Sequence, residues 1–358
     1  MDSSLRDIRE KVERGERLSV GDAVRLYASD DLIAIGKMAN LVRERMHGDT
    51  TYYVVNRHIN PTNLCVNRCR FCAFSRSPGE TGAYAMALEE VLSRARDAAD
   101  DGITELHIVG GLHPDLPYAY YRDIVSRLHE EFPGIHLQAY TAVEIAHFAG
   151  ISGMSTREVL ADLRSVGLGS LPGGGAEIFA DRVRQVLCPE KLPAEDWLRI
   201  HGEAHELGLR TNATMLYGHV ETDEERVDHL NRLRAQQDRT GGFQSFIPLL
   251  FHPANTTVRR TRQPDGFDGL KNIAVPRVFL DNFPHVKSFW IMLGLKVAQV
   301  SLHFGADDLD GTVGEERITH EAGATTPQSI TREELVGLIR EAGRVAVERD
   351  TVYNVIGG

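Results

Sequence analysis

The chain has 358 residues, 42% hydrophobic and 25% charged, so it can bury a substantial core in one main domain with extensions. Its 51 acidic residues outnumber its 40 basic ones and give a net charge of -11, which argues against a nucleic-acid-binding surface and favours a small-molecule partner. No stretch approaches the roughly 20 apolar residues of a membrane span, and the first residues carry no apolar signal segment, so we expect a cytoplasmic protein without membrane contact.

The order of the predicted elements indicates an α/β barrel. Residues 5–47 predict helices, because their apolar residues lack strand alternation and Ser19 with Asp22 resembles a capping box. From residue 52 onward, short apolar or alternating runs alternate with amphipathic stretches, which is typical of βα units. The predicted strands are 52–59, 105–109, 136–141, 167–171, 210–216, 243–251, 288–293 and 297–304. Eight such strands predict a closed (β/α)8 barrel of the TIM type.

Segments with apolar residues at helical spacing separate several of these strands, and a further helix is predicted near the end of the chain. Thr222 with Glu225, and Thr331 with Glu334, resemble capping boxes that begin two of these helices. Residues 307–328 are polar and predict the longest irregular segment. The expected organisation is a helical N-terminal extension (1–50), a barrel (51–310), and a C-terminal loop and helix packed on the barrel (311–358).

Three of the four cysteines follow the first predicted strand directly. Cys65, Cys69 and Cys72 have the spacing CxxxCxxC, and thiolates on one compact loop are typical ligands of an iron-sulfur cluster. Three protein ligands would leave the fourth iron of a [4Fe-4S] cluster open. A closed structural zinc site would need a fourth ligand, and no second cysteine pair exists. Cys188 is predicted to be a small apolar residue on the outer, helical side.

The cysteine loop also carries a specific resemblance. Cys65, Cys69, Phe71 and Cys72 match the CxxxCxΦC motif of radical S-adenosylmethionine (SAM) enzymes. Residues 58–63, 110–117 and 140–145 resemble the group that contains the enzymes of the menaquinone futalosine pathway and the deazaflavin synthase of coenzyme F420 synthesis. This resemblance implies a [4Fe-4S] cluster whose open iron binds SAM, and a flavodoxin or ferredoxin as the reductant.

Four further segments narrow the resemblance within that group. Residues 171–179, 280–287, 289–294 and 307–312 are most similar to members that add the 5'-deoxyadenosyl radical to the enolpyruvyl double bond of 3-[(1-carboxyvinyl)oxy]benzoate. SAM would then be a cosubstrate, and the products would be 6-amino-6-deoxyfutalosine, methionine and bicarbonate. The alternatives are a dehypoxanthine futalosine cyclase, a deazaflavin synthase subunit and, from a different class, an iron-sulfur electron carrier.

The resemblance also assigns expected contacts with SAM. The glycine pair that ends the second strand would let backbone approach the ligand, although Leu112 stands where many members have a glutamate. A segment near residue 218 resembles the one that supports adenine, although Thr214 replaces its first glycine. Glu144 can accept hydrogen bonds from SAM, or it is a solvated residue at a helix N-terminus. The expected cofactor contacts are Phe71, Gly110, Gly111, Glu144, Asn212 and Gly218.

Substrate contacts and proton-transfer groups are expected in the loops that follow the strands, where barrel enzymes build their active sites. The substrate candidates are Glu177, His252, Asn255 and His320. The candidates for a general acid or base are His113, Asp307 and Asp308. Radical addition requires no general base, which agrees with the absence of a triad or a paired-carboxylate motif in the sequence.

Overall fold

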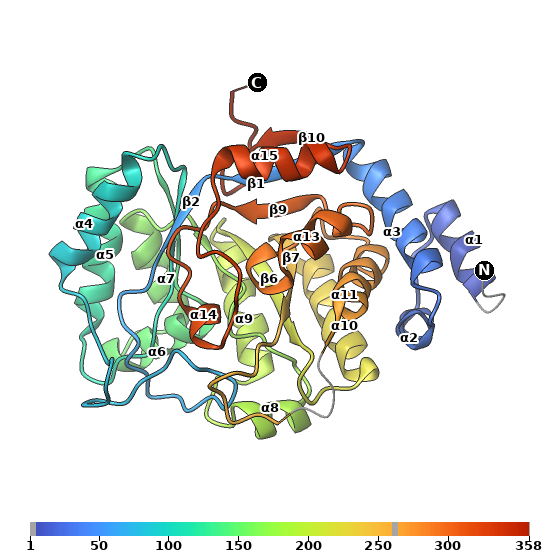
Figure 1. Cartoon of the computed structure of the whole chain (residues 1–358). Helices are drawn as coiled ribbons and strands as arrows, with labels where there is room; N and C mark the ends of the chain where they lie inside the picture. Colours follow the sequence, from blue (N-terminus) through green and yellow to red (C-terminus); the bar gives the residue numbers. More distant parts are fainter. Residues whose placement is uncertain (1–4, 260–263, 358) are drawn as a thin grey trace.

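The computed structural model describes residues 5–259 and 264–357, and helices lie outside a central group of short strands (Figure 1). The strands are β1 (Thr50–Val54), β2 (Asn56–Ile59), β3 (Glu105–Ile108), β4 (His136–Ala139), β5 (Ser170–Leu171), β6 (Arg210–Tyr217), β7 (Phe243–Leu250), β8 (His285–Val286), β9 (Asp308–Gly311) and β10 (Val345–Glu348). Strands β2 to β8 form one parallel sheet in sequence order.

The two ends of this sheet are joined through β9 and β1. Lys287, directly after β8, forms a parallel bridge with Asp308 of β9. Strand β9 pairs with β1, and β1 runs through the single residue Val55 into β2. The ring therefore contains eight parallel strand positions, with β1 and β2 sharing one, and the predicted α/β barrel is confirmed.

The helices cover the outside of the ring. They are α1 (Arg6–Arg14), α2 (Val20–Ala28), α3 (Leu32–His47), α4 (Leu88–Ala99), α5 (Tyr118–Glu131), α6 (Ala142–Ser152), α7 (Thr156–Ser165), α8 (Asp181–Leu187), α9 (Ala194–Glu206), α10 (Asp223–Thr240), α11 (Gly266–Phe279), α12 (Trp290–Leu293), α13 (Leu295–Ser301), α14 (Ile318–Glu321) and α15 (Arg332–Glu341). The predicted capping boxes begin α2, α10 and α15. The N-terminal helices pack on the barrel through α3 against α11, and β10 pairs with β1.

Two predicted strands are wrong. Residues 288–293 and 297–304 contain the helices α12 and α13, and the seventh and eighth strands are β8 and β9 instead. Short apolar runs have the same appearance in a buried helix and in a buried strand, so their periodicity does not separate the two. The predicted irregular segment 307–328 likewise contains β9 and α14, because β9 is too polar to show a strand pattern.

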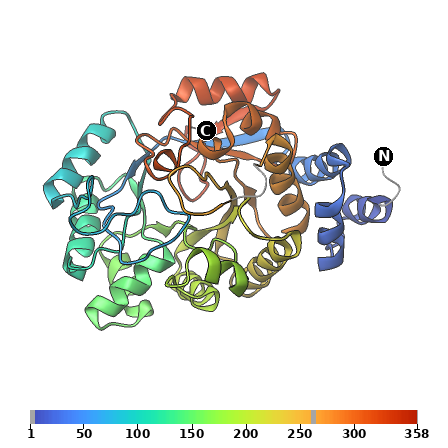
Figure 2. The ribbon, with the colours of Figure 1, turned by 60° about the horizontal axis from the view of Figure 1, so that its bottom comes forward.

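The loops that follow the C-terminal ends of the strands lie together at one end of the barrel. This end is at the bottom of Figure 1, where α8 lies, and comes forward in Figure 2. The backbone N–H of Arg70, in the long segment between β2 and α4, donates to the carbonyl of Leu187 at the end of α8. A cavity of about 330 Å³ opens at this end, within the size range of small-molecule sites.

Candidate active site

The cysteine loop is held rigidly by its own backbone and by its neighbours. The Asn63 side chain donates to the carbonyl of Gly82 at 2.9 Å and accepts from the N–H of Tyr84 at 2.8 Å, which ties the two ends of the loop together. The N–H of Val66 donates to the carbonyl of Leu112 at 2.9 Å, which fixes the loop to the segment after β3. The three cysteines therefore lie on a loop that is tied by hydrogen bonds to its neighbours.

All three predicted cluster cysteines line the cavity, and each is a free thiol. Burial raises the pKa of Cys65 above its ordinary value and raises the pKa of Cys69 to about 12. Without a metal these thiols stay protonated at neutral pH, so a cationic group is needed to hold them as thiolates. Three thiols on one short loop, facing one cavity, fit a [4Fe-4S] cluster that leaves one iron open to a ligand in the cavity.

Cys188 lies beside this loop and not on the outer side as expected. It is buried at the end of α8, and it does not line the cavity. As expected, it packs in the hydrophobic core.

The glycine pair after β3 is required by the cysteine loop. A Cβ added to Gly111 would lie 2.2 Å from the carbonyl oxygen of Leu64, the residue before Cys65. A Cβ on Gly110 would lie 3.0 Å from the carbonyl oxygen of Thr62. Both glycines line the cavity. Because they have no side chains, the cysteine loop can pack closely against the end of β3, and this places the thiols in the cavity.

Glu144 is a buried capping residue that lines the same cavity. Its carboxylate accepts the N–H of Gly110 at 3.0 Å and the N–H of Thr141 at 2.7 Å, in the capping box that begins α6. Burial raises the pKa of Glu144 to about 7, against the lowering effect of these hydrogen bonds. The solvated alternative is wrong, because only 4% of this residue is exposed.

An ion pair stands beside the cysteines. Lys191 Nζ donates to Glu177 Oε1 at 2.6 Å, both side chains are nearly buried, and the ammonium lies 5.2 Å from the centre of the Phe71 ring. Burial lowers the pKa of Lys191, but Glu177 and Cys69 outweigh this effect and raise it. Sequence reasoning found Glu177 and Phe71 and missed Lys191, because the lysine belongs to the polar connection between α8 and α9, which carries no motif.

The remaining predicted contacts differ in their position relative to the cavity. Asn212 lines it from β6, whereas Gly218 lies just beyond β6, outside the lining residues, and its N–H donates to Glu221 at 2.5 Å. His252 lines the cavity with its Nε2 at 3.0 Å from the carbonyl oxygen of Met292. Asn255 is exposed and donates to the carbonyl of Glu321.

The two other predicted histidines point their ring nitrogens to local partners. His320 Nδ1 lies 2.8 Å from Glu316, which helps to raise its pKa against the effect of burial, and its Nε2 lies 2.8 Å from the carbonyl oxygen of Thr326. His113 Nδ1 accepts from the N–H of Asp115 at 3.0 Å. Neither histidine is among the cavity-lining residues.

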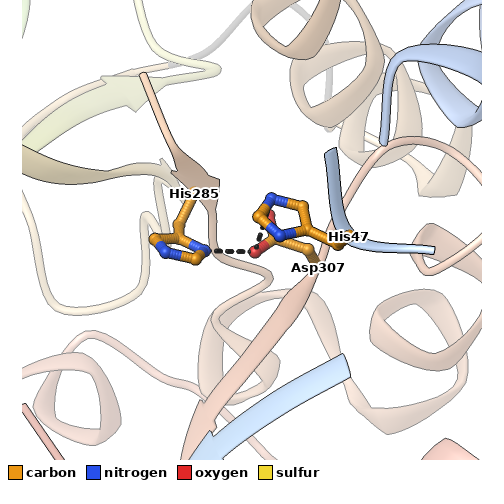
Figure 3. Close-up of side chains that lie close together, drawn as sticks. All are labelled: His47, His285 and Asp307. Carbon is orange, nitrogen blue, oxygen red and sulfur yellow. Dashed lines mark hydrogen bonds and ion pairs between the residues drawn. The ribbon is translucent and has the colours of Figure 1, made fainter. Parts of the chain in front are cut away.

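The placement of Asp307 and Asp308 is corrected by the structure. They precede and begin β9, so they lie at the opposite end of the barrel from the cysteines and do not line the cavity. Asp307 pairs with the buried Arg277. Its Oδ2 accepts from His285 Nδ1 at 2.5 Å, and His47 Nε2 lies 3.4 Å from the same oxygen (Figure 3). Asp308 pairs with Arg349. These carboxylates join distant segments of the chain.

A polar floor lies deeper in the cavity, below the cysteine loop, and sequence reasoning missed it. His58 of β2 and His107 of β3 are register partners whose rings stack at 4.5 Å, and Lys287 Nζ donates to Asp310 Oδ1 at 2.9 Å. The signal that could have found the histidines is a polar residue at an equivalent position of two adjacent predicted strands. Lys287 and Asp310 gave no such signal, because neither residue lies in a predicted strand. The floor is formed by His58, Glu105, His107, Gln138, Lys287 and Asp310.

Comparison with known proteins defines the class. A model of the radical SAM superfamily matches residues 59–233, and a model of the CofH/MqnC C-terminal region matches residues 240–356. The chain therefore belongs to the radical SAM superfamily, which implies a 4Fe-4S cluster and SAM. The solved structure of methylornithine synthase shares the fold, with a TM-score of 0.76 at 17% identity over 94% of this chain and 96% of that one.

Particular relatives are much more similar in sequence. The chain is 50% identical to the aminodeoxyfutalosine synthase of Thermus thermophilus, over 99% of this chain and 96% of that protein. It is 48% identical to the aminodeoxyfutalosine synthase of Streptomyces coelicolor, with 99% and 95% covered. The identity to the cyclic dehypoxanthine futalosine synthase of Halalkalibacterium halodurans is 39%, with 99% and 95% covered. No helix among the described residues is long and apolar enough to cross a membrane.

Proposed function

We propose that this chain is an aminodeoxyfutalosine synthase that joins the adenosyl group of SAM to 3-[(1-carboxyvinyl)oxy]benzoate. The observation that carries the proposal is 50% identity over nearly the full length of such a synthase, against 39% for the cyclase of the same pathway. The products are 6-amino-6-deoxyfutalosine, methionine and bicarbonate. The cavity supports this function, because it joins three free thiols to a chamber with an apolar wall and a polar floor.

Cys65, Cys69 and Cys72 hold the cluster in this proposal. Held there, the cluster would supply the electron for reductive cleavage of SAM, and a flavodoxin or ferredoxin would be its reductant. Hydrogen bonds through Asn63 and Val66 hold the loop that carries these thiols.

The groups around the cysteines bind and orient SAM. Lys191, Glu177 and Glu144 line the cavity beside the cysteines. There Lys191 would face the carboxylate of the methionine part of SAM, and the two glutamates would accept hydrogen bonds from its ammonium and hydroxyl groups. Gly110 and Gly111 leave room for the ligand against the backbone. Phe71 and Asn212 complete the proposed contacts of the adenosyl part, whereas Gly218 lies outside the lining.

The apolar wall of the cavity separates the radical from water. Leu216, Leu249, Phe289 and Met292 line it, and Ile247 lines it at the level of Lys287. These side chains exclude water and hold the enolpyruvyl carbon against the adenosyl carbon, so catalysis rests on positioning.

The test is anaerobic reconstitution with iron and sulfide, followed by SAM, dithionite and each candidate acceptor, with the adenosyl product identified by mass spectrometry. We expect an adenosylated product only with the enolpyruvyl benzoate. Release of free 5'-deoxyadenosine alone, with consumption of dehypoxanthine futalosine, would establish the cyclase instead. Turnover only with tyrosine and 5-amino-6-(D-ribitylamino)uracil would establish the activity that a 43% identical relative from Methanoculleus marisnigri is named for.

A further inference from the structure

The polar floor contains a cation that the proposed SAM contacts do not use. Among the residues that the structure describes, only two lysines and no arginine line the cavity. Lys191 stands beside the cysteines, where its positive charge acts on Cys69. Lys287 directly follows β8 and lies level with Ile247 of β7. Ile247 is three residues before the end of β7, so Lys287 lies about 10 Å below the rim of the barrel. The two cations therefore stand at different depths.

Three carboxylates need partners in this cavity when the proposed reactants bind. One is the methionine carboxylate of SAM, which belongs near the cysteines that would hold the cluster. The second is the enolpyruvyl carboxylate of the substrate, which is attached to the reacting double bond. The third is the aryl carboxylate, which remains in the product and is separated from that double bond by the ring. A dianionic ligand loses its hydration on entering an apolar cavity, so each carboxylate requires a cation or donors there.

On this basis, which rests on the proposed function, we propose that Lys287, together with the stacked imidazoles of His58 and His107, binds the aryl carboxylate of the substrate. Lys287 is 3% exposed, and the ammonium donates to Asp310 Oδ1. No hydrogen-bond partner of either imidazole is found within 5–259 and 264–357, and both rings line the cavity. The floor thus presents donors toward the ligand.

The acidic groups in and beside the floor each have hydrogen-bond partners of their own. Glu105 accepts from Asn56 at 3.0 Å and from Gln138 at 3.2 Å. Glu316 accepts from the N–H of Thr319 at 2.8 Å and contacts the ring of His320. Burial raises the pKa of Asp310, but Lys287 outweighs this effect and holds it below its ordinary value.

The imidazoles are neutral donors in the unliganded cavity. Burial and mutual repulsion lower the pKa of His58 to about 3, and burial also lowers the pKa of His107. Glu105 and Asp310 oppose this lowering, whereas the positive charge of Lys287 adds to it. Lys287 therefore supplies the positive charge, and the two histidines supply N–H groups that position the carboxylate.

The test compares the substrate with (1-carboxyvinyl)oxybenzene, the same enol ether without the aryl carboxylate. Wild-type protein is expected to prefer the full substrate about 100-fold in kcat/KM, since a site built to bind a charged group rejects a ligand that lacks it. The principal variant is Lys287→Met with Asp310→Asn, because removing both members avoids an unpaired buried carboxylate. This double variant is expected to lose most of the preference by losing activity on the full substrate.

Two single variants serve as controls. Asp310→Asn keeps the cation and should retain the preference, and asparagine tolerates the positive φ of 65° at this position. Lys191→Met should lower kcat/KM for both compounds by similar factors, because it acts on SAM. Lys287→Gln replaces the double variant if circular dichroism shows that the latter does not fold.

Three results would overturn the inference. An unchanged preference in the Lys287 variants would show that this lysine does not bind the aryl carboxylate. Loss of the preference in Lys191→Met would place that carboxylate near the cysteines instead. Absence of any adenosylated product from wild-type protein with either compound would refute the proposed function itself, and the inference with it.

Discussion

Replacing Gly111 by alanine tests whether the glycine pair exists to seat the cysteine loop. The new Cβ would lie 2.2 Å from the carbonyl oxygen and 2.8 Å from the carbonyl carbon of Leu64, which are backbone atoms that no side-chain rotation can move. Relieving the contact requires the loop to move by about 0.8 Å or more, and overpacking of this kind costs about 1–3 kcal/mol. The displaced residue adjoins Cys65, so cluster assembly should fall together with stability.

The assay measures the free energy of unfolding by urea, and iron and sulfide per chain after anaerobic reconstitution. Gly150→Ala in α6 is the matched control, because a Cβ there meets nothing within 4 Å and alanine favours the helix. We expect Gly111→Ala to lose stability and to bind substoichiometric iron, and Gly150→Ala to match or exceed the wild type. Full reconstitution of Gly111→Ala at unchanged stability would refute the reasoning.

Three further predictions concern groups at different depths of the barrel. Cys69→Ser should abolish the visible absorption of the reconstituted cluster, whereas Cys188→Ser should keep it; loss in both would make Cys188 part of the site. Burial raises the pKa of Glu144 from 4.5 to about 7, so its contribution to stability is complete below pH 4.5 and is lost as the pH rises through 7. Glu144→Gln, which can still cap α6, should therefore gain up to about 3 kcal/mol over the wild type by pH 8 in urea unfolding, and parallel pH profiles would contradict this. Asp307→Asn leaves the buried Arg277 unpaired and should lower the unfolding free energy by about 3–5 kcal/mol while the iron content of the folded fraction stays normal; a variant as stable as the wild type would show that the pair contributes little.

The sequence determined the site around the cysteines because its signals are local. Three thiols within eight residues, and the glycine pair after the next strand, are read from short segments whose spacing alone limits what they can bind. The first six strands were also placed near their observed positions, since each combines an apolar run with a turn or a helical stripe. In these segments the residue types and the hydrophobic periodicity can both be read from a few neighbouring residues.

Only the tertiary structure decided the floor of the cavity and the closure of the barrel. Strands β8 and β9 are two and four residues long and carry histidine and aspartate, so they show no strand pattern, and apolar helices beside them took their place in the prediction. Lys191 and Glu177 lie in the connections on either side of α8, so only the folded chain brings them together.

His58, His107, Lys287 and Asp310 come from four strand positions that are far apart along the chain, and they meet because β9 and β1 close the ring. A polar residue inside a short strand has no periodic signature of its own. Its role depends on which strand lies beside it and which side chains share the interior. The sequence therefore identified the chemistry at the rim of the barrel, and closure of the ring decided what lies beneath it.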